Sequence, residues 1–226
     1  MQQSEPKGRL LVLEGLDGSG KATQARLLAG ALRAEGRPVK EITFPDYASD
    51  SSALVRMYLA GQFGPRPDDV NAYAASSFYA VDRYASYKTG WGGFYAEGGV
   101  VVADRYTTSN AVHQCSKLPP SGWDAYLDWL FDYEYRLLGL PAPARVIYLE
   151  VEPEVSQQLM AARYHGDASR RDVHERDLDY QARSRAAAAY CARRLGWATV
   201  HCTRGGAIRP PEQIAAEVLA LARAAL

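Results

Sequence analysis

The chain has few cysteines, no long apolar run and no excess of either charge, and each absence excludes a class of protein. Its cysteines, Cys115, Cys191 and Cys202, include no C-x-x-C pair, which indicates free thiols in a reducing compartment and argues against a zinc site. The first residues, MQQSEPKGRL, contain no apolar signal core, and the longest apolar run, 186–192, is mostly alanine. Because a membrane-spanning helix needs about 20 apolar residues, we expect a cytoplasmic protein without a membrane segment.

Charge and composition are ordinary. The 26 Lys and Arg residues balance the 26 Asp and Glu residues, which gives no support for nucleic acid or a membrane surface as a partner bound through bulk charge. Apolar residues make up 47% of the chain and charged residues 23%, as in soluble globular proteins. No internal repeat or long linker is present, so we expect a single domain over residues 1–226 with a sizeable core.

The chain does contain short apolar runs that alternate with longer helical stretches. The runs are rich in Val, Ile and Leu and lack strict polar alternation, which is typical of strands covered on both faces. Segments such as 21–35, 69–90 and 122–139 have helical composition. The alternation predicts an α/β fold with a mostly parallel sheet flanked by helices. The predicted strands are 9–14, 39–44, 99–104, 145–151 and 198–202.

The segment LEGLDGSGKATQ, residues 13–24, is similar to the phosphate-loop pattern G-x-x-x-x-G-K-[ST]. Gly15, Gly20 and Lys21 match the pattern, and the segment follows a predicted strand and opens a predicted helix. In such a loop, backbone N–H groups and the helix N-terminus bind phosphate, and the lysine neutralises its charge. The alternative is a glycine-rich turn that merely joins a strand to a helix.

One position departs from the pattern. Ala22 has no hydroxyl to hold Mg²⁺, and Thr23 comes one place late, where a rotation of about 100° should turn it elsewhere. A metal ion would therefore rely on carboxylates and phosphates. Asp104 ends the apolar run VVVAD, at the strand end where phosphate-loop enzymes place a magnesium-binding carboxylate. Arg105 beside it suits phosphate, unless the two side chains simply pair with each other.

Two further segments allow a functional or a structural interpretation. Tyr79 and Arg83 are four residues apart in FYAVDRYASYK, on one helical face, where they could contact the same flat ligand. The alternative is an aromatic helix packed into the core. Residues 163–185 hold six arginines and five acids, which form either a solvated helix face or part of a site.

Taken together, these motifs resemble the thymidylate kinases of the nucleoside monophosphate kinase group. The likeness runs in order from LEGLDGSGK through FPDY (44–47), FYAVDR (78–83) and DRYTTSNAVHQ (104–114) to an arginine-rich lid with DVHE (172–175). It is greatest to a bacterial branch that carries GSGKATQ, in which Ala22 is a variant of a working loop. The resemblance implies a P-loop NTPase fold, with a five-stranded parallel β-sheet flanked by helices and a helical lid at about 163–176. It also implies the reaction ATP + dTMP → ADP + dTDP with Mg²⁺, in dTTP biosynthesis.

The same resemblance implies roles around ATP and the metal. Asp17 would receive the 3′-OH of the acceptor sugar, and the carboxylates of Asp17, Asp104 and Glu175 would place Mg²⁺. Residues of the phosphate loop, 15–23, would hold the phosphates, and the Gly-Gly loop near the C-terminus would touch adenine. The implied ATP-binding residues are Gly15, Gly18, Ser19, Gly20, Lys21, Ala22, Thr23, Arg204 and Ala207.

The acceptor pocket is implied in the same way. Phe44 and Pro45 would border it, and Tyr79 would stack on thymine. Arg83 would bond to O4 of the base, with Asn110 also on the base edge. The resemblance thus assigns one stacking contact, from Tyr79, and two polar contacts, from Arg83 and Asn110, to the base.

At the other end of the acceptor, Arg105 would grip the 5′-phosphate, toward which Tyr47 would reach. His113 stands where many relatives have an aromatic residue that crowds out a ribose 2′-OH, so selection of the sugar is open. The catalytic residues implied are Lys21, Asp17, Arg105, Arg163 and Arg171.

The bacterial type takes its catalytic arginines from the lid. Four arginines there, 163, 170, 171 and 176, are candidates, of which we favour Arg163 and Arg171. Asp172 and Glu175 match the lid acids that hold metal or brace the lid. Closure of such a lid over the phosphates would exclude water. The remaining histidines, 165, 174 and 201, are interpreted as lid or packing residues.

Family members are usually homodimers, so a homodimer is expected by resemblance. Two alternative functions stay open. One is a kinase for another acceptor, such as dUMP or a deoxynucleoside; a nucleoside acceptor would need a base for its 5′-OH. The other is a non-catalytic nucleotide-binding or regulatory protein, suggested by Ala22.

Overall fold

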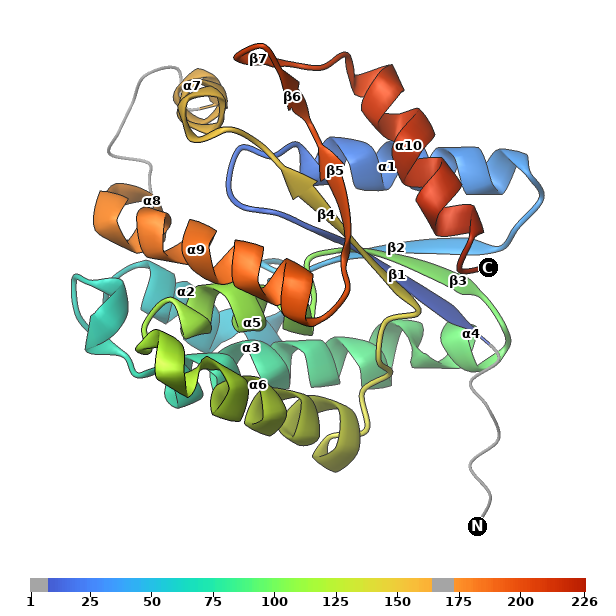
Figure 1. The fold of residues 1–226 in the computed structure, drawn as a ribbon. Helices are drawn as coiled ribbons and strands as arrows, with labels where there is room; N and C mark the ends of the chain where they lie inside the picture. The colour runs from blue at the N-terminus through green and yellow to red at the C-terminus, as the bar shows by residue number, and fades with distance from the viewer. Residues whose placement is uncertain (1–7, 164–172) are drawn as a thin grey trace.

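The computed structural model describes residues 8–163 and 173–226, with the side chains of these residues except Arg163 and Arg176. Five parallel strands form the central sheet in the order β2-β3-β1-β4-β5 (Figure 1). Both the α/β class and the number of strands were predicted from the sequence, and the observed ends differ from the predicted ones by no more than one residue. The strands are β1 (Arg9–Glu14), β2 (Val39–Thr43), β3 (Val100–Asp104), β4 (Arg145–Glu150) and β5 (Ala198–His201).

Helices cover both faces of the sheet, and side chains that alternate along β1 divide between the two layers. Leu11 and Leu13 face α1 (Lys21–Ala34) and α10 (Pro211–Arg223), which lie side by side on one face. Leu10 and Val12 face the opposite layer (Figure 1). Because successive side chains of a strand point to opposite faces, a sheet buried on both faces needs apolar residues at every position.

The opposite layer contains the longer helical segments. Two of them end in a π-helical stretch: α3 (Ala72–Ser86) continues into η3 (Tyr87–Trp91), and α6 (Trp123–Phe131) continues into η5 (Asp132–Leu137). The remaining elements of this layer and its connections are α2 (Ala53–Leu59), α4 (Gly92–Ala96), α5 (Thr107–Cys115), α9 (Leu178–Arg194) and the short turns η1 (Asp50–Ser52), η2 (Pro67–Asp69) and η4 (Pro120–Gly122).

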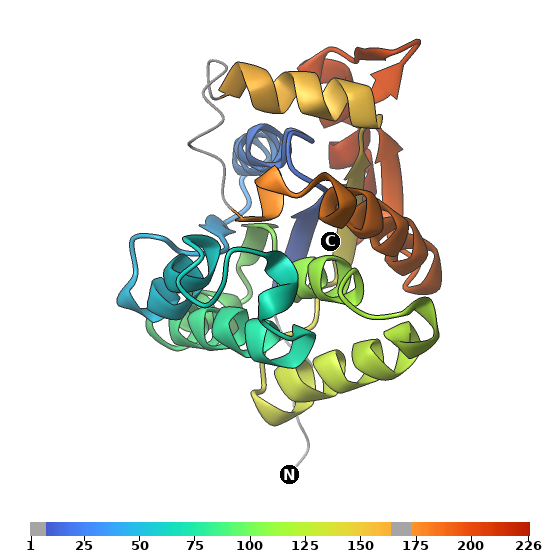
Figure 2. The same cartoon turned by 90° about the vertical axis from the view of Figure 1, so that its left-hand side faces the viewer.

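Two helices lie on either side of the residues that the structure does not describe. Helix α7 (Pro153–Arg163) precedes them and α8 (Val173–Arg176) follows them. Figures 1 and 2 both show α7 beyond the end of β4, beside the loop that precedes α1. Ser156 of α7 donates a hydrogen bond to the backbone carbonyl of Asp17 in that loop, at 2.6 Å.

The chain after β5 forms a small hairpin instead of a simple Gly-Gly loop. Strands β6 (Thr203–Arg204) and β7 (Ala207–Ile208) pair antiparallel, and Arg204 lies opposite Ala207. Gly205 and Gly206 occupy the two turn positions with φ of 61° and 75°. A two-residue hairpin turn with two positive φ angles strongly favours glycine, which explains the pair.

The three cysteines are free, as the sequence predicted, and all three are buried. Among the described helices, none combines the length and the apolar character that a membrane-spanning segment requires.

Candidate active site

A cavity with a volume of about 620 Å³ lies at the carboxyl ends of β1 and β3. Parallel pairing places Leu13 of β1 and Thr43 of β2 beside Asp104 of β3, so the loops after these strands meet. The cavity brings together most of the residues predicted from the sequence. They are Asp17, Gly18, Ser19, Gly20, Lys21, Ala22, Thr23, Phe44, Pro45, Tyr47, Tyr79, Arg83, Asp104, Arg105, Asn110, His113 and Glu175.

The phosphate loop has the backbone that its glycines predict. Gly18 and Gly20 have φ of 76° and 81°, and α1 begins at Lys21 with no side chain capping its N–H groups. A Cβ on Gly15 would lie 2.6 Å from Oγ of Ser19 and 2.9 Å from the carbonyl of Leu149, so this position has no room for a side chain. The uncapped N–H groups of the first turn are donors for an anion.

Lys21 lies within this loop and is 7% exposed. Its Nζ donates to the carbonyl of Leu16 at 2.8 Å and to Oγ of Ser19 at 3.3 Å. Burial, and then the charge of Arg105, lower the pKa of Lys21 to about 8. The ammonium is thus held by loop oxygens, which a bound phosphate can replace.

The residue after Asp104 has an unusual backbone. Arg105 has φ of 68° and is the one non-glycine residue with positive φ in the described ranges. Its backbone N–H donates to the carbonyl of Leu13 at 3.1 Å, which joins it to the end of β1. This left-handed conformation is strained for a residue with a Cβ and tends to occur at functional sites.

The Arg105 side chain lies among acceptors from three directions. Nη2 donates to Oδ1 of Asp17 at 2.5 Å, and Nη1 donates to Nε2 of His113 at 3.2 Å. Oε1 of Glu14, which is 1% exposed, lies 3.7 Å from Nη1. Burial would lower the pKa of this guanidinium, but Asp17 and Glu14 outweigh it and raise the pKa. Arg105 is a fixed positive charge in the middle of the cavity.

Asp17 has a different environment from Asp104. Burial alone would raise the pKa of Asp17, yet the charges of Arg105 and Lys21 outweigh it and hold the pKa well below its usual range. In Asp104, Oδ1 is buried and has no hydrogen-bond partner among the described residues. Glu175 also borders the cavity and is 6% exposed.

These carboxylates fit a magnesium ion only in part. No cluster of three metal-binding side chains occurs within the described ranges. Magnesium usually binds one or two carboxylates together with waters and substrate phosphates, so a complete protein cage is not required. The buried, unpaired oxygen of Asp104 is the position that suits a hard cation best, because it is an acceptor that lacks a protein donor.

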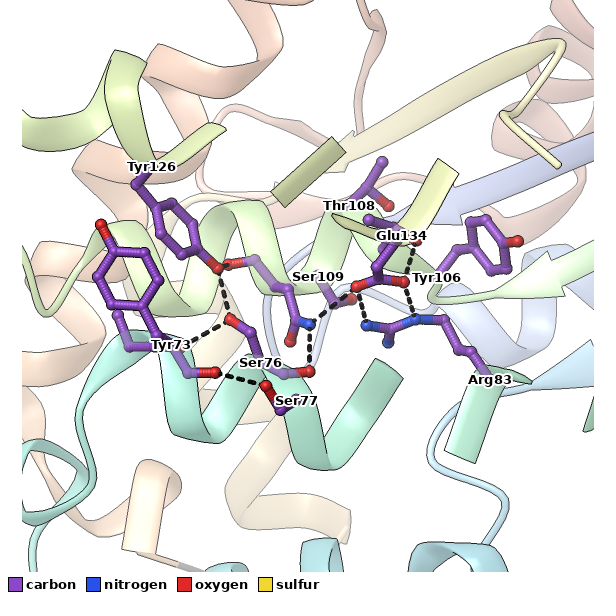
Figure 3. Close-up of polar contacts among 12 residues, drawn as sticks. Tyr73, Ser76, Ser77, Arg83, Tyr106, Thr108, Ser109, Tyr126 and Glu134 are labelled. Atoms are coloured by element: carbon purple, nitrogen blue, oxygen red, sulfur yellow. Dashed lines mark hydrogen bonds and ion pairs between the residues drawn. The ribbon is translucent and has the colours of Figure 1, made fainter. Parts of the chain in front are cut away.

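The far end of the cavity is built around a buried ion pair (Figure 3). Arg83 and Glu134 are 1% and 0% exposed, and Nε and Nη2 of the arginine donate to the two carboxylate oxygens at 2.7 and 2.5 Å. Thr107 and Asn110 also donate to this carboxylate, at 2.7 and 3.2 Å. Arg83 borders the cavity, and its guanidinium is paired with an acid that the prediction did not include.

A second buried network lies beside Arg105. His113 accepts from Arg105 through Nε2, so a neutral imidazole carries its proton on Nδ1, which lies 3.2 Å from the hydroxyl of Tyr180. Burial and the charge of Arg105 lower the pKa of His113 to about 3. The His174 ring stacks on that of His113, with centroids 5.8 Å apart, and its Nε2 is 2.8 Å from the hydroxyl of Tyr58.

Four functional candidates were absent from the prediction. Glu14 accepts hydrogen bonds from the side chains of Thr108 and Ser109, and its sequence signal is an acid at the end of an apolar strand. Gln114 ends the motif 104–114, is fully buried beside the cavity, and has neither amide atom bonded among the described residues.

The other two lie further along the chain. Glu134 occurs four residues after the buried Leu130, which places a charge on the inward stripe of a helix. His174 was interpreted as a lid or packing residue, and it does pack on His113, but it also borders the cavity.

Several predicted residues are placed differently or not described. Thr23 borders the same cavity as Ala22, in the first turn of α1. Arg204 and Ala207 lie in the β6–β7 hairpin and do not border this cavity. Arg170, Arg171 and Asp172 of the predicted lid lie outside the described residues, as do the side chains of Arg163 and Arg176.

Comparisons with known proteins relate this chain to thymidylate kinases. A family model for thymidylate kinase matches residues 13–205. The thymidylate kinase of Mycobacterium tuberculosis is 34% identical over 190 residues, which cover 83% of this chain and 87% of that protein. The thymidylate kinase of Caenorhabditis elegans is 28% identical over 167 residues, or 70% of each chain. The solved structure of thymidylate kinase from Candida albicans has a TM-score of 0.69 and 19% identity, covering 98% of this chain and 93% of its own, which shows a shared fold.

Lys21 should make the affinity for ATP depend on pH. Its pKa of about 8 in the free protein lies below the ordinary value, whereas bound phosphate favours the charged ammonium. Affinity is therefore full below this pKa and falls as the pH rises through it. Calorimetric titration with MgATP should show about a tenfold weaker affinity near pH 9 than near pH 7.

The control for this experiment is Lys21→Gln, which has no titrating ammonium. It should bind MgATP more weakly than the wild type and with a flat pH profile over the same range. A flat wild-type profile, or a variant that keeps the wild-type slope, would contradict the account of Lys21.

Proposed function

The chain belongs to the thymidylate kinase family, and we propose that it transfers the γ-phosphate of ATP to dTMP, giving ADP and dTDP. As a member of this family it is an ATP-dependent phosphotransferase acting on a nucleoside monophosphate. One observation carries the choice of acceptor: a single cavity joins the phosphate loop to an end bordered by Tyr79, Arg83 and Asn110. An acceptor nucleotide fits this cavity with its phosphate toward the loop and its base toward the buried ion pair.

The phosphate of the acceptor would bind at Arg105. This guanidinium is charged at every physiological pH and lies beside the loop that binds the donor. Tyr47, which is 58% exposed at the mouth of the cavity, would reach the same phosphate. The acceptor phosphate and Asp17 would both contact Arg105, and Asp17 would also accept a hydrogen bond from the sugar 3′-OH.

The base would lie among Tyr79, Arg83, Asn110 and Gln114, bordered by Phe44 and Pro45, which share a cis peptide bond. Tyr79 would stack on the ring and Arg83 would donate to O4. The unpaired amide of Gln114 would bond to a further polar atom of the base, since a buried amide without a partner is costly. His113, between Arg105 and Tyr180, would border the sugar.

In the reaction, an oxygen of the acceptor phosphate attacks the γ-phosphorus in line and ADP leaves. No protein base is needed, because that oxygen is already ionised. Lys21 and the N–H groups of α1 offset the negative charge that gathers on the transferred group. Asp104 would hold Mg²⁺, with Asp17 and Glu175 nearby, and the ion would supply further charge neutralisation between the phosphates.

Other parts of the donor site are proposed from the family resemblance. Arg163 and Arg171 would approach the transferred phosphate from the lid, where an arginine can supply about 10³–10⁵ in rate. Arg204 and Ala207 would touch adenine through the β6–β7 hairpin. The free, buried cysteines support a cytoplasmic location, because such thiols are typical of a reducing compartment.

We also propose a homodimer. On the outer face of α3, Tyr73, Val81 and Tyr84 are 45%, 43% and 38% exposed, and their spacing places them on one side of the helix. An exposed apolar stripe of this kind suits a partner helix.

The acceptor preference can be measured by ADP release with MgATP and, in turn, dTMP, dUMP, UMP, dCMP or thymidine. We expect dTMP to give the highest kcat/KM, and EDTA to abolish turnover. Lys21→Ala should reduce turnover by about a hundredfold to a thousandfold, since it removes the positive charge that offsets the negative charge of the transferred phosphate.

A preference for another acceptor would replace dTMP in the proposal. If no acceptor gave ADP release although the protein still bound ATP, a regulatory nucleotide-binding protein would be favoured. Unchanged turnover in Lys21→Ala would contradict the assignment of the loop itself.

The oligomeric state is tested by sedimentation velocity at micromolar concentration. The proposal predicts a species of about twice the 24.8 kDa chain mass, and Tyr84→Glu should shift it to the monomer by placing a charge in the interface. A wild-type protein that sediments as a monomer would contradict the dimer.

A further inference from the structure

The buried carboxylate of Glu134 contacts two of the three polar side chains proposed to recognise the base, those of Arg83 and Asn110. It lies in η5, outside every motif of the sequence, and it is 0% exposed. Figure 3 shows its side chain pointing toward that of Arg83, between α3 and α5. Its four hydrogen bonds come from Arg83 twice, from Thr107 and from Asn110.

Glu134 determines which part of Arg83 remains for a ligand. A guanidinium has five N–H donors and no acceptor. Because Nε and Nη2 are directed at the carboxylate, Nη1 is the nitrogen of Arg83 that is left for the cavity this residue borders. Arg83 therefore presents an N–H donor to the cavity, and two hydrogen bonds to Glu134 hold its guanidinium in place.

Glu134 and the backbone carbonyl of Ser76 together fix the orientation of the Asn110 amide. Nδ2 of Asn110 donates to the backbone carbonyl of Ser76 and to Oε1 of Glu134, both at 3.2 Å. Both partners accept and neither can donate, so the amide nitrogen must face them. The oxygen Oδ1 is then the atom of this amide left for a ligand, and it offers an acceptor.

We propose that Glu134 is a positioning residue that determines base specificity: by holding Arg83 and Asn110, it makes the cavity present a donor beside an acceptor. This inference rests on the proposed function. A pyrimidine with a 4-oxo group matches the pattern, since O4 accepts and N3–H donates. A 4-amino pyrimidine has the opposite pattern, with a donor at position 4 and an acceptor at N3, and is rejected.

Stability alone gives little reason for a charge at this position. Glu134 continues the inward stripe of Leu127 and Leu130, where an apolar side chain would pack. Buried ion pairs contribute little net stability compared with well-packed apolar residues of similar volume. A role in fixing the two base-contacting side chains accounts for the carboxylate.

The test compares kcat/KM for dTMP with kcat/KM for dCMP in the wild type and in Glu134→Gln. A glutamine has one acceptor oxygen where the carboxylate has two, so it cannot accept from both Arg83 and Asn110 as Glu134 does, and the pair is no longer held in the arrangement that matches a 4-oxo pyrimidine. The ratio of dTMP to dCMP should fall about tenfold or more, because discrimination between bases depends on matched hydrogen bonds. A loss of folded enzyme alone would lower both values equally and leave the ratio unchanged.

Two further variants make the result decisive. Tyr126→Phe is the matched control, since it removes hydrogen bonds to Ser76 and to the Asn110 carbonyl without touching Glu134, and it should keep the wild-type ratio. Glu134→Asp keeps the charge opposite Arg83 but withdraws the carboxylate, so it serves where Glu134→Gln does not fold, and the ratio should fall in the same direction.

The outcomes separate this inference from the proposed function. A wild-type enzyme that does not phosphorylate dTMP contradicts the proposed function. A wild type that prefers dTMP, with Glu134 variants that keep its ratio of dTMP to dCMP, contradicts this inference alone. An equal fall of the ratio in Tyr126→Phe would also overturn it, because the effect would then belong to packing of the whole network.

Discussion

The ion pair between Arg105 and Asp17 joins the two loops on which the site depends. Asp17 lies in the phosphate loop after β1, and Arg105 follows β3, the neighbouring strand. Parallel pairing brings these loops together, and the left-handed backbone of Arg105 lets its N–H bond to β1. An acceptor phosphate bound at Arg105 would thus lie beside the loop that binds the donor, and the pairing of β1 with β3 would hold the two loops together.

Buried positive charge of this kind is tolerable only because acids surround it. Arg105 faces Asp17 and Glu14, and Arg83 faces Glu134. The two pairs differ in what a ligand can do to them. Asp17 is partly exposed, so an anionic ligand can share Arg105 with it, whereas Glu134 is fully buried and stays on Arg83. Arg105 is therefore suited to bind an anionic ligand that comes and goes, whereas Arg83 is suited to present a fixed set of hydrogen-bond donors.

Local patterns in the sequence predicted the sheet, the phosphate loop and the position of Asp104 and Arg105 at the end of a strand, because each of these depends on neighbouring residues. Glu134 escaped prediction because its partner Arg83 is 51 residues away, and nothing local marks an acid on an inward helical stripe as paired. Gln114 lay inside a quoted motif, but only the structure shows that its amide is buried without a partner.

The most direct test of the account is whether Arg105 binds the phosphate of the acceptor. Calorimetric titration of the wild type and of Arg105→Gln with dTMP and with thymidine isolates that contact, since the two ligands differ only in the phosphate. We expect the wild type to bind dTMP far more tightly than thymidine, and the variant to lose most of this difference while its affinity for thymidine stays unchanged. A variant that keeps the full preference for dTMP would contradict the central role of Arg105.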